Sequence, residues 1–211
     1  VTGFVIEDGK CSGVETSRGR INAGRVGIAV AGHTSHVAKM AGMTLPVESH
    51  ILQAFVTEPI KPIVDNVISW GAELFYLSQS DKGGLVFGGH IDGFNTYTQR
   101  GQFNRIQTVA ECAVSLMPFI SRLRLLRHWG GIQDMTPDGS PFICRTPTRN
   151  LYLNGGWCYQ GFKATPASGW TFAHTIAHDQ EHELVRDFAL DRFEKGRELD
   201  EFGLGNWTYK Q

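Results

Sequence analysis

One stretch near the C-terminus constrains the fold of this 211-residue chain more than any other, because three patterns follow one another there. Apolar residues 151–154 predict a buried strand, a glycine-rich loop follows, and residues 165–181 have a helical pattern. Thr165 is a suitable N-cap, and Pro166 fits the first turn of such a helix. A buried strand that leads directly into a helix predicts an α/β layer, and the helix N-terminus can bind an anionic group.

Lys163 lies at this expected helix N-terminus and adds a full positive charge to it. A strand-to-helix loop with a solvated lysine is an equally good interpretation of the composition alone. The residue types in this segment therefore indicate either an anion site or a plain connection.

The remaining segments predict an α+β fold built mainly from antiparallel strands. Asp8-Gly9 marks a hairpin between two short strands, and apolar residues 25–31 predict a buried strand. The middle of the chain combines further strands with one helix, at residues 46–60, 67–70, 74–78, 85–90, 102–116 and 125–132. We therefore expect an antiparallel-sheet domain at 45–130, placed between two parts of one Rossmann-like α/β layer at 1–44 and 131–211.

Composition and charge exclude several classes of protein. The net charge is −1, and the densest basic cluster, Arg122, Arg124 and Arg127, is too small for a nucleic-acid interface. No apolar run reaches the roughly 18–20 residues of a membrane span, and residues 1–5 resemble a strand more than a signal peptide. We therefore expect a cytoplasmic protein with no nucleic-acid or membrane partner. The four cysteines form no Cys-x-x-Cys pair, which favours reduced thiols over a zinc site.

Neither of the common phosphate-binding loops occurs in the sequence. No Gly-x-Gly-x-x-Gly follows a strand, and no Gly-x-x-x-x-Gly-Lys-Ser/Thr is present. The sequence also begins without Met, inside an expected strand. If the protein binds a dinucleotide, we expect the phosphate-binding half to lie outside this chain.

The glycine-rich loop and the start of the helix contain the pattern Gly161-x-Lys163-x-x-Pro166-x-x-Gly169 directly after a strand. This pattern resembles the C-terminal flavin motif of the superfamily of D-amino-acid oxidases, glycine oxidases and sarcosine oxidases. The resemblance implies bound FAD, with the backbone of Gly161 and Phe162 close to the isoalloxazine ring. It also places Lys163 at the flavin edge or at a substrate carboxylate.

A second segment resembles the same superfamily near the N-terminus. The apolar run at 25–31 ends in Ala31-Gly32, which the resemblance places beside FAD. Val1 matches a valine of the superfamily whose backbone meets the adenine. From composition alone, an ordinary core strand would explain this segment equally well.

A third segment, residues 129–141, resembles a superfamily stretch that contains Thr-Pro-Asp-Gly, although Cys144 replaces its last glycine. The amino-acid oxidases have an arginine at the position of Gln133, where it clamps the substrate carboxylate. Glutamine cannot supply that bidentate cation. We therefore expect Lys163 to bind the carboxylate, and the departure favours the sarcosine branch.

Four stretches narrow the resemblance to the β subunits of heterotetrameric sarcosine oxidases, namely residues 46–62, 78–83, 95–101 and 191–196. The match covers nearly the whole chain and aligns it with the C-terminal half of such a subunit. In that family the Rossmann fingerprint and the histidine that carries covalent FMN lie upstream, so no histidine here is assigned to FMN. The implied partners are the N-terminal half of the same subunit and the α, γ and δ subunits.

The resemblance suggests three further site residues. Arg124 and Arg127 are candidates to bind FMN, because a guanidinium suits a phosphate or a flavin edge, although a solvated basic turn is an equal alternative. His90 follows two glycines at a strand end, where single-subunit sarcosine oxidases place a pocket histidine. A structural hydrogen bond would also explain it.

Three further histidines, His174, His178 and His182, fall at helical spacing. The helix end is polar and no His-Glu-x-x-His is present, so they do not indicate a metal site.

The implied function is that of an oxidoreductase acting on the N-methyl group of sarcosine. The products would be glycine and H2O2, with 5,10-methylenetetrahydrofolate when tetrahydrofolate is present, and electrons would pass from FAD to FMN and then to O2. One alternative is another FAD amine oxidase or dehydrogenase, of the glycine or dimethylglycine type. The other is a non-catalytic fragment that binds partner chains, and we expect the isolated fragment to be inactive.

Overall fold

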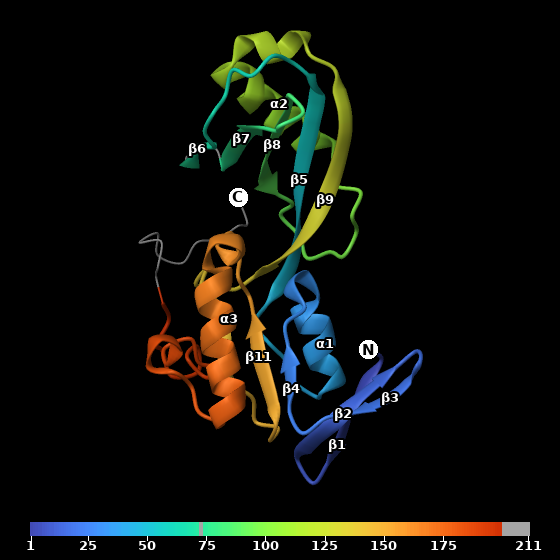
Figure 1. The fold of residues 1–211 in the computed structure, drawn as a ribbon, viewed down its shortest axis with the longest axis vertical. Coiled ribbons are helices and arrows are strands. Elements are labelled where there is room, and N and C mark those ends of the chain that lie inside the picture. The colour runs from blue at the N-terminus through green and yellow to red at the C-terminus, as the bar shows by residue number, and fades with distance from the viewer. Residues whose placement is uncertain (72–73, 200–211) are drawn as a thin grey trace. The chain divides into compact units, whose positions relative to one another are not determined.

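The computed structural model describes residues 1–71 and 74–199, and the chain divides into two units (Figure 1). Unit 1 comprises Val1–Ser49 and the described residues from Gln133 onward, whereas unit 2 comprises His50–Ile132. Antiparallel sheets and helices are both present, so the predicted α+β class is confirmed. In the described part of the chain, no helix has the length and apolar character that a membrane crossing requires.

Unit 1 begins with a three-stranded antiparallel sheet formed by β1 (Gly3–Glu7), β2 (Lys10–Thr16) and β3 (Gly19–Asn22). Between β1 and β2, Asp8 has a φ of 49° and Gly9 a φ of 70°, as a two-residue hairpin turn of type I′ requires. The predicted hairpin is therefore confirmed.

A second sheet lies at the centre of unit 1 and consists of β10 (Phe142–Arg145), β11 (Leu151–Gly155) and β4 (Val26–Ile28), in that order. β10 is antiparallel to β11, and β11 is parallel to β4. Alternate side chains of β10 and β11 face opposite sides of the sheet.

Two helices cover the faces of this central sheet (Figure 1). Tyr152 packs with Phe172 of α3 (Gly161–His178), whereas Leu151 and Leu153 pack with Ala38 of α1 (Thr34–Met40). Short 3₁₀ turns, η1 (Ala31–His33) and η4 (Glu183–Val185), precede α1 and follow α3. The sheet therefore has a helix on each face, as an α/β layer does.

Two elements of unit 1 differ from the sequence prediction. β4 is only three residues long and ends at Ile28, so that Ala29, Val30 and Ala31 lie beyond it and are exposed, with Ala31 at a φ of 46°. α3 begins at Gly161 and not at 165, so Pro166 lies inside the helix. Its ring removes the N–H that would bond the carbonyl of Phe162, which the exposed first turns of the helix tolerate because water can reach that carbonyl.

Unit 2 contains a five-stranded sheet with the order β6 (Ile68–Trp70), β7 (Phe75–Gln79), β8 (Gly84–Ile91), β5 (Glu48–Pro59) and β9 (Leu125–Met135). The first four strands pair with antiparallel registers. α2 (Phe103–Leu116) places Val109 and Ala113 against a core that includes Phe55 and Phe87, and η3 (Pro118–Arg122) follows it. The helix agrees with the prediction at 102–116, because its apolar side chains recur at helical spacing and meet this one sheet.

Candidate functional site

The glycine-rich loop after β11 is shaped by close packing against two threonines. A Cβ on Gly155 would lie 2.6 Å from the Oγ1 of Thr34, and a Cβ on Gly156 would lie 2.6 Å from the Cγ2 of Thr136. Gly156 also has a φ of 77°, and Cys158 a φ of 51°, so the chain reverses sharply before α3. Side chains at these two glycines would push the loop away from α1 and from the end of β9.

Asp134, near the end of β9, is the acceptor that holds this loop. Its side chain is 4% exposed, and its Oδ2 accepts a hydrogen bond from the N–H of Gly156. The hydroxyl of Thr34 lies 3.3 Å from the same oxygen, and the backbone carbonyl of Asp134 accepts a bond of 3.0 Å from the N–H of Cys158. Burial raises the pKa of Asp134, and the hydrogen bonds from Gly156, Thr34 and Trp157 offset that rise only in part.

The Ala31-Gly32 turn is joined to the loop through Thr34. The hydroxyl of Thr34 donates to the carbonyl of Ala31 at 2.6 Å, in addition to its contact with Asp134. Ser49 donates to the carbonyl of Gly32 at 2.6 Å. The structure therefore brings Ala31 and Gly32 together with the glycine-rich loop, two segments that the sequence analysis had singled out separately.

The N-terminal turns of α3 are exposed. Phe162 is 97% exposed, Lys163 is also exposed, and Trp170 two turns later is 58% exposed. Gln160 at the N-cap makes no side-chain capping bond, so the helix presents its first N–H groups without a side-chain acceptor there. An aromatic side chain and a cation at an uncapped helix N-terminus form a surface suited to a planar anionic ligand.

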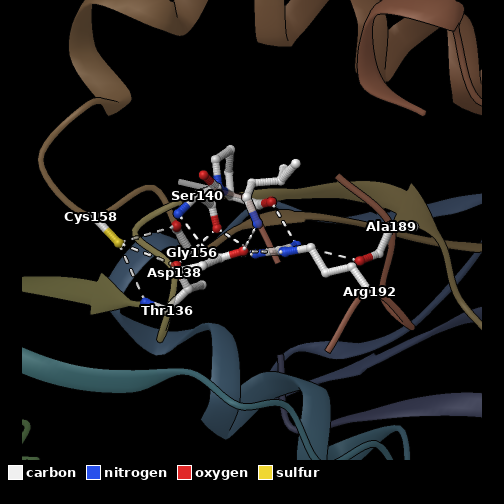
Figure 2. Close-up of polar contacts among 9 residues, drawn as sticks. Thr136, Asp138, Ser140, Gly156, Cys158, Ala189 and Arg192 are labelled. Carbon is white, nitrogen blue, oxygen red and sulfur yellow. Dashed lines mark hydrogen bonds and ion pairs between the residues drawn. The ribbon is translucent and has the colours of Figure 1, made fainter. Parts of the chain in front are cut away.

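The Thr-Pro-Asp-Gly turn contains a buried ion pair that the sequence analysis missed (Figure 2). Nε and Nη2 of Arg192 donate to the two carboxylate oxygens of Asp138 at 2.7 and 2.9 Å, and both side chains are at most 2% exposed. The guanidinium also donates to the carbonyls of Ser140 and Pro141 at 2.7 and 3.0 Å, and it lies 4.1 Å from the ring centre of Phe142. This turn therefore binds the C-terminal tail and is occupied by it.

The ion pair determines the protonation of Asp138. Burial by itself would raise its pKa, but the hydrogen bonds and the positive charge of Arg192 outweigh burial and hold the pKa below its ordinary value. The only hints in the sequence were an aspartate in a turn and one of several arginines in a charged tail segment, 54 residues apart. No local pattern pairs two such residues.

The three spaced histidines do not share one helix. α3 ends at His178, with Asp179 in the left-handed region, so His182 lies beyond the helix. The ring of His174 is nevertheless 4.4 Å from that of His178 and 4.9 Å from that of His182, centre to centre. Within the described residues, no group of three or more His, Cys, Asp or Glu side chains could hold a metal ion.

A family model described as FAD dependent oxidoreductase, the DAO family, matches residues 1–175. The chain belongs to this family of FAD dependent oxidoreductases. The match includes η1, the Thr-Pro-Asp-Gly turn, the glycine-rich loop and most of α3.

Two curated relatives of this flavoenzyme chain are named sarcosine oxidase subunit beta. The protein of Rhizobium meliloti (strain 1021) is 57% identical over 97% of the chain and 49% of its own length. The protein of Arthrobacter sp is 48% identical over 96% of the chain and 50% of its own length. The chain therefore spans about half the length of the curated relatives that it matches.

Solved structures of flavoenzymes share the fold. The crystal structure of L-proline dehydrogenase from P. horikoshii has a TM-score of 0.83 and 32% identity, and the match covers 93% of the chain and 54% of that protein. Glycine oxidase from Geobacillus kaustophilus has a TM-score of 0.80 at 20% identity, over 91% of the chain and 51% of that protein, which shows a common fold.

The remaining residues that the flavin motif resemblance suggested lie in both units. Val1 is 62% exposed and precedes β1 in unit 1. His90, Arg124 and Arg127 belong to unit 2. His90 has a φ of 51° at the end of β8, and its Nε2 lies 3.7 Å from the Sγ of Cys112. Both arginine side chains are exposed at the start of β9, an edge strand.

Gln133 is a half-buried polar residue on β9. Its Oε1 is buried and has no hydrogen-bond partner among the residues that the structure describes. A buried acceptor of this kind costs free energy unless a donor meets it.

Proposed function

We propose that this chain is the C-terminal, substrate-side half of a flavin-dependent oxidase that oxidises the N-methyl group of sarcosine. The products would be glycine and H2O2, and 5,10-methylenetetrahydrofolate in the presence of tetrahydrofolate. The observation that carries the proposal is the exposed, uncapped N-terminus of α3, with Phe162 and Lys163 next to a rigid glycine-rich loop. The two relatives named sarcosine oxidase subunit beta support the choice of substrate.

Bound FAD would accept a hydride equivalent from the N-methyl carbon, and the protein would bind, orient and shield the reactants. The N–H groups of Gly161 and Phe162 and the ammonium group of Lys163 would meet the flavin edge or the substrate carboxylate. Donors fixed before the reaction stabilise negative charge without reorganisation, which lowers the barrier. Ala31, Gly32 and Val1 would contact FAD through their backbone.

Three residues of unit 2 are further candidates for roles in the proposed function. His90 would line the substrate pocket, where an imidazole can hold or accept a proton. Arg124 and Arg127 would bind the phosphate or the flavin edge of FMN, because both guanidinium groups are exposed on the same strand end. The FMN attachment histidine would lie outside this chain.

The proposed assembly contains further chains. The chain matches about half the length of relatives whose names mark them as subunits, which supports the other half of the same subunit and α, γ and δ subunits as partners. The phosphate-binding loop for FAD would be in that other half.

Substitution of Lys163 tests the site. In the natural protein purified with its partners, Lys163→Met should lower kcat/KM for sarcosine on the order of 10²–10³-fold, because it removes one fixed charge from the reacting centre. Lys39→Met is the matched control, because Lys39 is an exposed lysine near the end of α1. Equal activity of Lys163→Met and the control would rule out the assignment.

Flavin content tests the cofactor separately. Gly161→Val should reduce bound FAD, measured by its visible absorption bands, because a branched side chain would stand where the backbone approaches the ring. Bound flavin equal to wild type would contradict the placement of the ring. A folded natural protein without any flavin bands would favour a module that binds partner chains only.

One alternative substrate class has support of its own. The chain is 32% identical to a protein described as L-proline dehydrogenase, and proline is, like sarcosine, a secondary amine. Steady-state turnover of sarcosine, N,N-dimethylglycine, glycine and L-proline would rank these substrates. A kcat/KM for proline above that for sarcosine would replace the proposed substrate.

A further inference from the structure

Two segments expected to face FAD are connected by buried side chains that are not expected to touch it. Thr34 bonds the carbonyl of Ala31 on one side and contacts Asp134 on the other. Asp134 in turn accepts from the N–H of Gly156 and, through its backbone carbonyl, from the N–H of Cys158. Thr34 is 0% exposed and Asp134 is 4% exposed, so this connection is internal to unit 1.

The packing around the connection leaves little room for movement. Gly155 lies so close to Thr34, and Gly156 to Thr136, that a Cβ on either glycine would clash, so only glycine lets the loop pack here against Thr34 of α1 and Thr136 after β9. Thr136 also contacts Cys158, with a backbone N–H to Sγ distance of 3.3 Å (Figure 2). Movement of the loop away from these residues would break the bonds to Asp134. The loop therefore has one well-defined position while Thr34 and Asp134 are intact.

An aspartate at position 134 is unfavourable by itself, because its carboxylate is buried. Burial raises the pKa of Asp134, so the ionised carboxylate is disfavoured in the folded protein. Buried ionisable groups with a shifted pKa commonly have a role beyond stability. The partners of Asp134 here are backbone N–H groups of the loop and the side-chain hydroxyl of Thr34 on α1, which indicates that the role is to position these segments.

We infer that Thr34 and Asp134 are positioning residues, which hold the glycine-rich loop and the Ala31-Gly32 turn in the arrangement that binds the flavin. This inference rests on the proposed flavin function, and neither side chain is assigned a contact with the cofactor. Loss of either side chain would loosen residues 155–161 and would thereby weaken flavin binding.

Hydrogen exchange in the natural protein, measured by mass spectrometry without added flavin, tests the connection directly. Thr34→Val and Asp134→Asn should increase exchange in peptides that cover residues 154–162 on the order of tenfold, because each substitution removes or weakens buried hydrogen bonds of the connection. The dissociation constant for FAD, measured on the same samples, should rise on the order of tenfold as well.

Two further variants separate positioning from general loss of stability. Thr34→Ser keeps the hydroxyl and should restore both exchange and FAD affinity to near wild-type values. Thr175→Val is the matched control, because Thr175 is also 0% exposed and bonds a carbonyl within its own helix. Should Asp134→Asn fail to fold, the Thr34 pair alone decides the question.

Three results would overturn the inference. Wild-type exchange of residues 154–162 in both Thr34→Val and Asp134→Asn would show that these side chains do not hold the loop. Faster exchange with unchanged FAD affinity would show a purely structural role, as would an equal effect of Thr175→Val. If the wild-type protein binds no FAD, the proposed function fails, and the exchange data still decide whether the two side chains hold the loop.

Discussion

Asp138 of unit 1 and Asp92 of unit 2 are both deeply buried, but their carboxylates have opposite surroundings. In unit 1, Asp138 is met by the guanidinium of Arg192, and burial is outweighed so that its pKa lies below the ordinary value. In unit 2, Asp92 follows β8 and is 0% exposed, yet neither of its carboxylate oxygens accepts a hydrogen bond within the described residues. Burial raises its pKa, and Arg105 and Gln53 oppose that rise only in part.

The difference separates two consequences of burying a charge. A carboxylate with a complete set of donors holds sequence-distant segments together, whereas one whose neighbours do not offset its burial costs free energy when the chain folds. Equal burial therefore says nothing about whether a charged residue stabilises the protein. The partners of the charged group decide whether its burial stabilises or destabilises the fold.

The largest effect is expected when the pair in unit 1 is broken. Arg192→Met should lower the free energy of unfolding by about 3–5 kcal/mol, because it leaves the carboxylate of Asp138 buried without its cation. Methionine keeps much of the volume between the rings of Phe142 and Phe193, so the loss reports mainly on the charge. Urea unfolding of the natural protein, with and without Arg192→Met, would measure this loss of stability.

A matched control is available on the surface for this first prediction. Lys195→Met also removes a cation from an ion pair with an aspartate, but the side chains of Lys195 and Asp191 are 50% and 45% exposed. It should change stability by less than about 0.5 kcal/mol. Equal losses in Arg192→Met and Lys195→Met would contradict the special role of burial.

The same substitution, Asp to Asn, should change the stability in opposite directions at the two carboxylates. Asp138→Asn should destabilise by about 3 kcal/mol, because the guanidinium of Arg192 loses its anion in a buried site. Asp92→Asn should stabilise by about 1 kcal/mol, because the amide is neutral and its NH₂ group can donate to the unpartnered Oε1 of Gln53. Thermal melts of the two variants side by side would test this, and a clear loss of stability in Asp92→Asn would show that a donor meets this carboxylate.

The pH dependence of stability should differ between the two sites. The folded pKa of Asp138 is lowered, so its contribution is fully present above the unfolded pKa of about 3.9 and is lost as the pH falls through the folded value. The folded pKa of Asp92 is raised, so its contribution is fully present below about 3.9 and is lost as the pH rises through the folded value. Unfolding curves between about pH 3 and 7 should therefore bring Asp138→Asn closer to wild type in acid and make Asp92→Asn more advantageous toward neutral pH.

Apart from the Lys195→Met control, the smallest effect is expected at a partly exposed pair in unit 1. Arg145 donates to Glu181 at 3.1 Å, and the two side chains are 49% and 26% exposed. Glu181→Gln should cost about 0.5 kcal/mol at low ionic strength and less at high salt, because water and ions screen this pair. A loss as large as that of Asp138→Asn would mean that the geometry of a pair matters more than its burial.

Local patterns predicted the elements whose structure depends on nearby residues. The hairpin at Asp8-Gly9 and the helix at 103–116 were expected because turn residues and helical apolar spacing act over a few positions. The strand and the loop before α3 were expected on the same grounds. The start of that helix was predicted too late, because Pro166 is more favourable in a first turn but is tolerated inside a solvent-exposed one.

The sequence by itself determined the α+β class, the family resemblance and the candidates at Gly161, Phe162 and Lys163, since these follow from short motifs and local propensity. Only the tertiary structure decided which buried polar groups meet. Asp138 and Arg192 are 54 positions apart, and Thr34 and Asp134 are 100 positions apart. Such pairs form because the folded sheets and helices bring the two residues together. A buried charge or hydroxyl without a partner costs free energy, so each needs the other. The residues next to each of them in the sequence show no pattern that would predict the pairing.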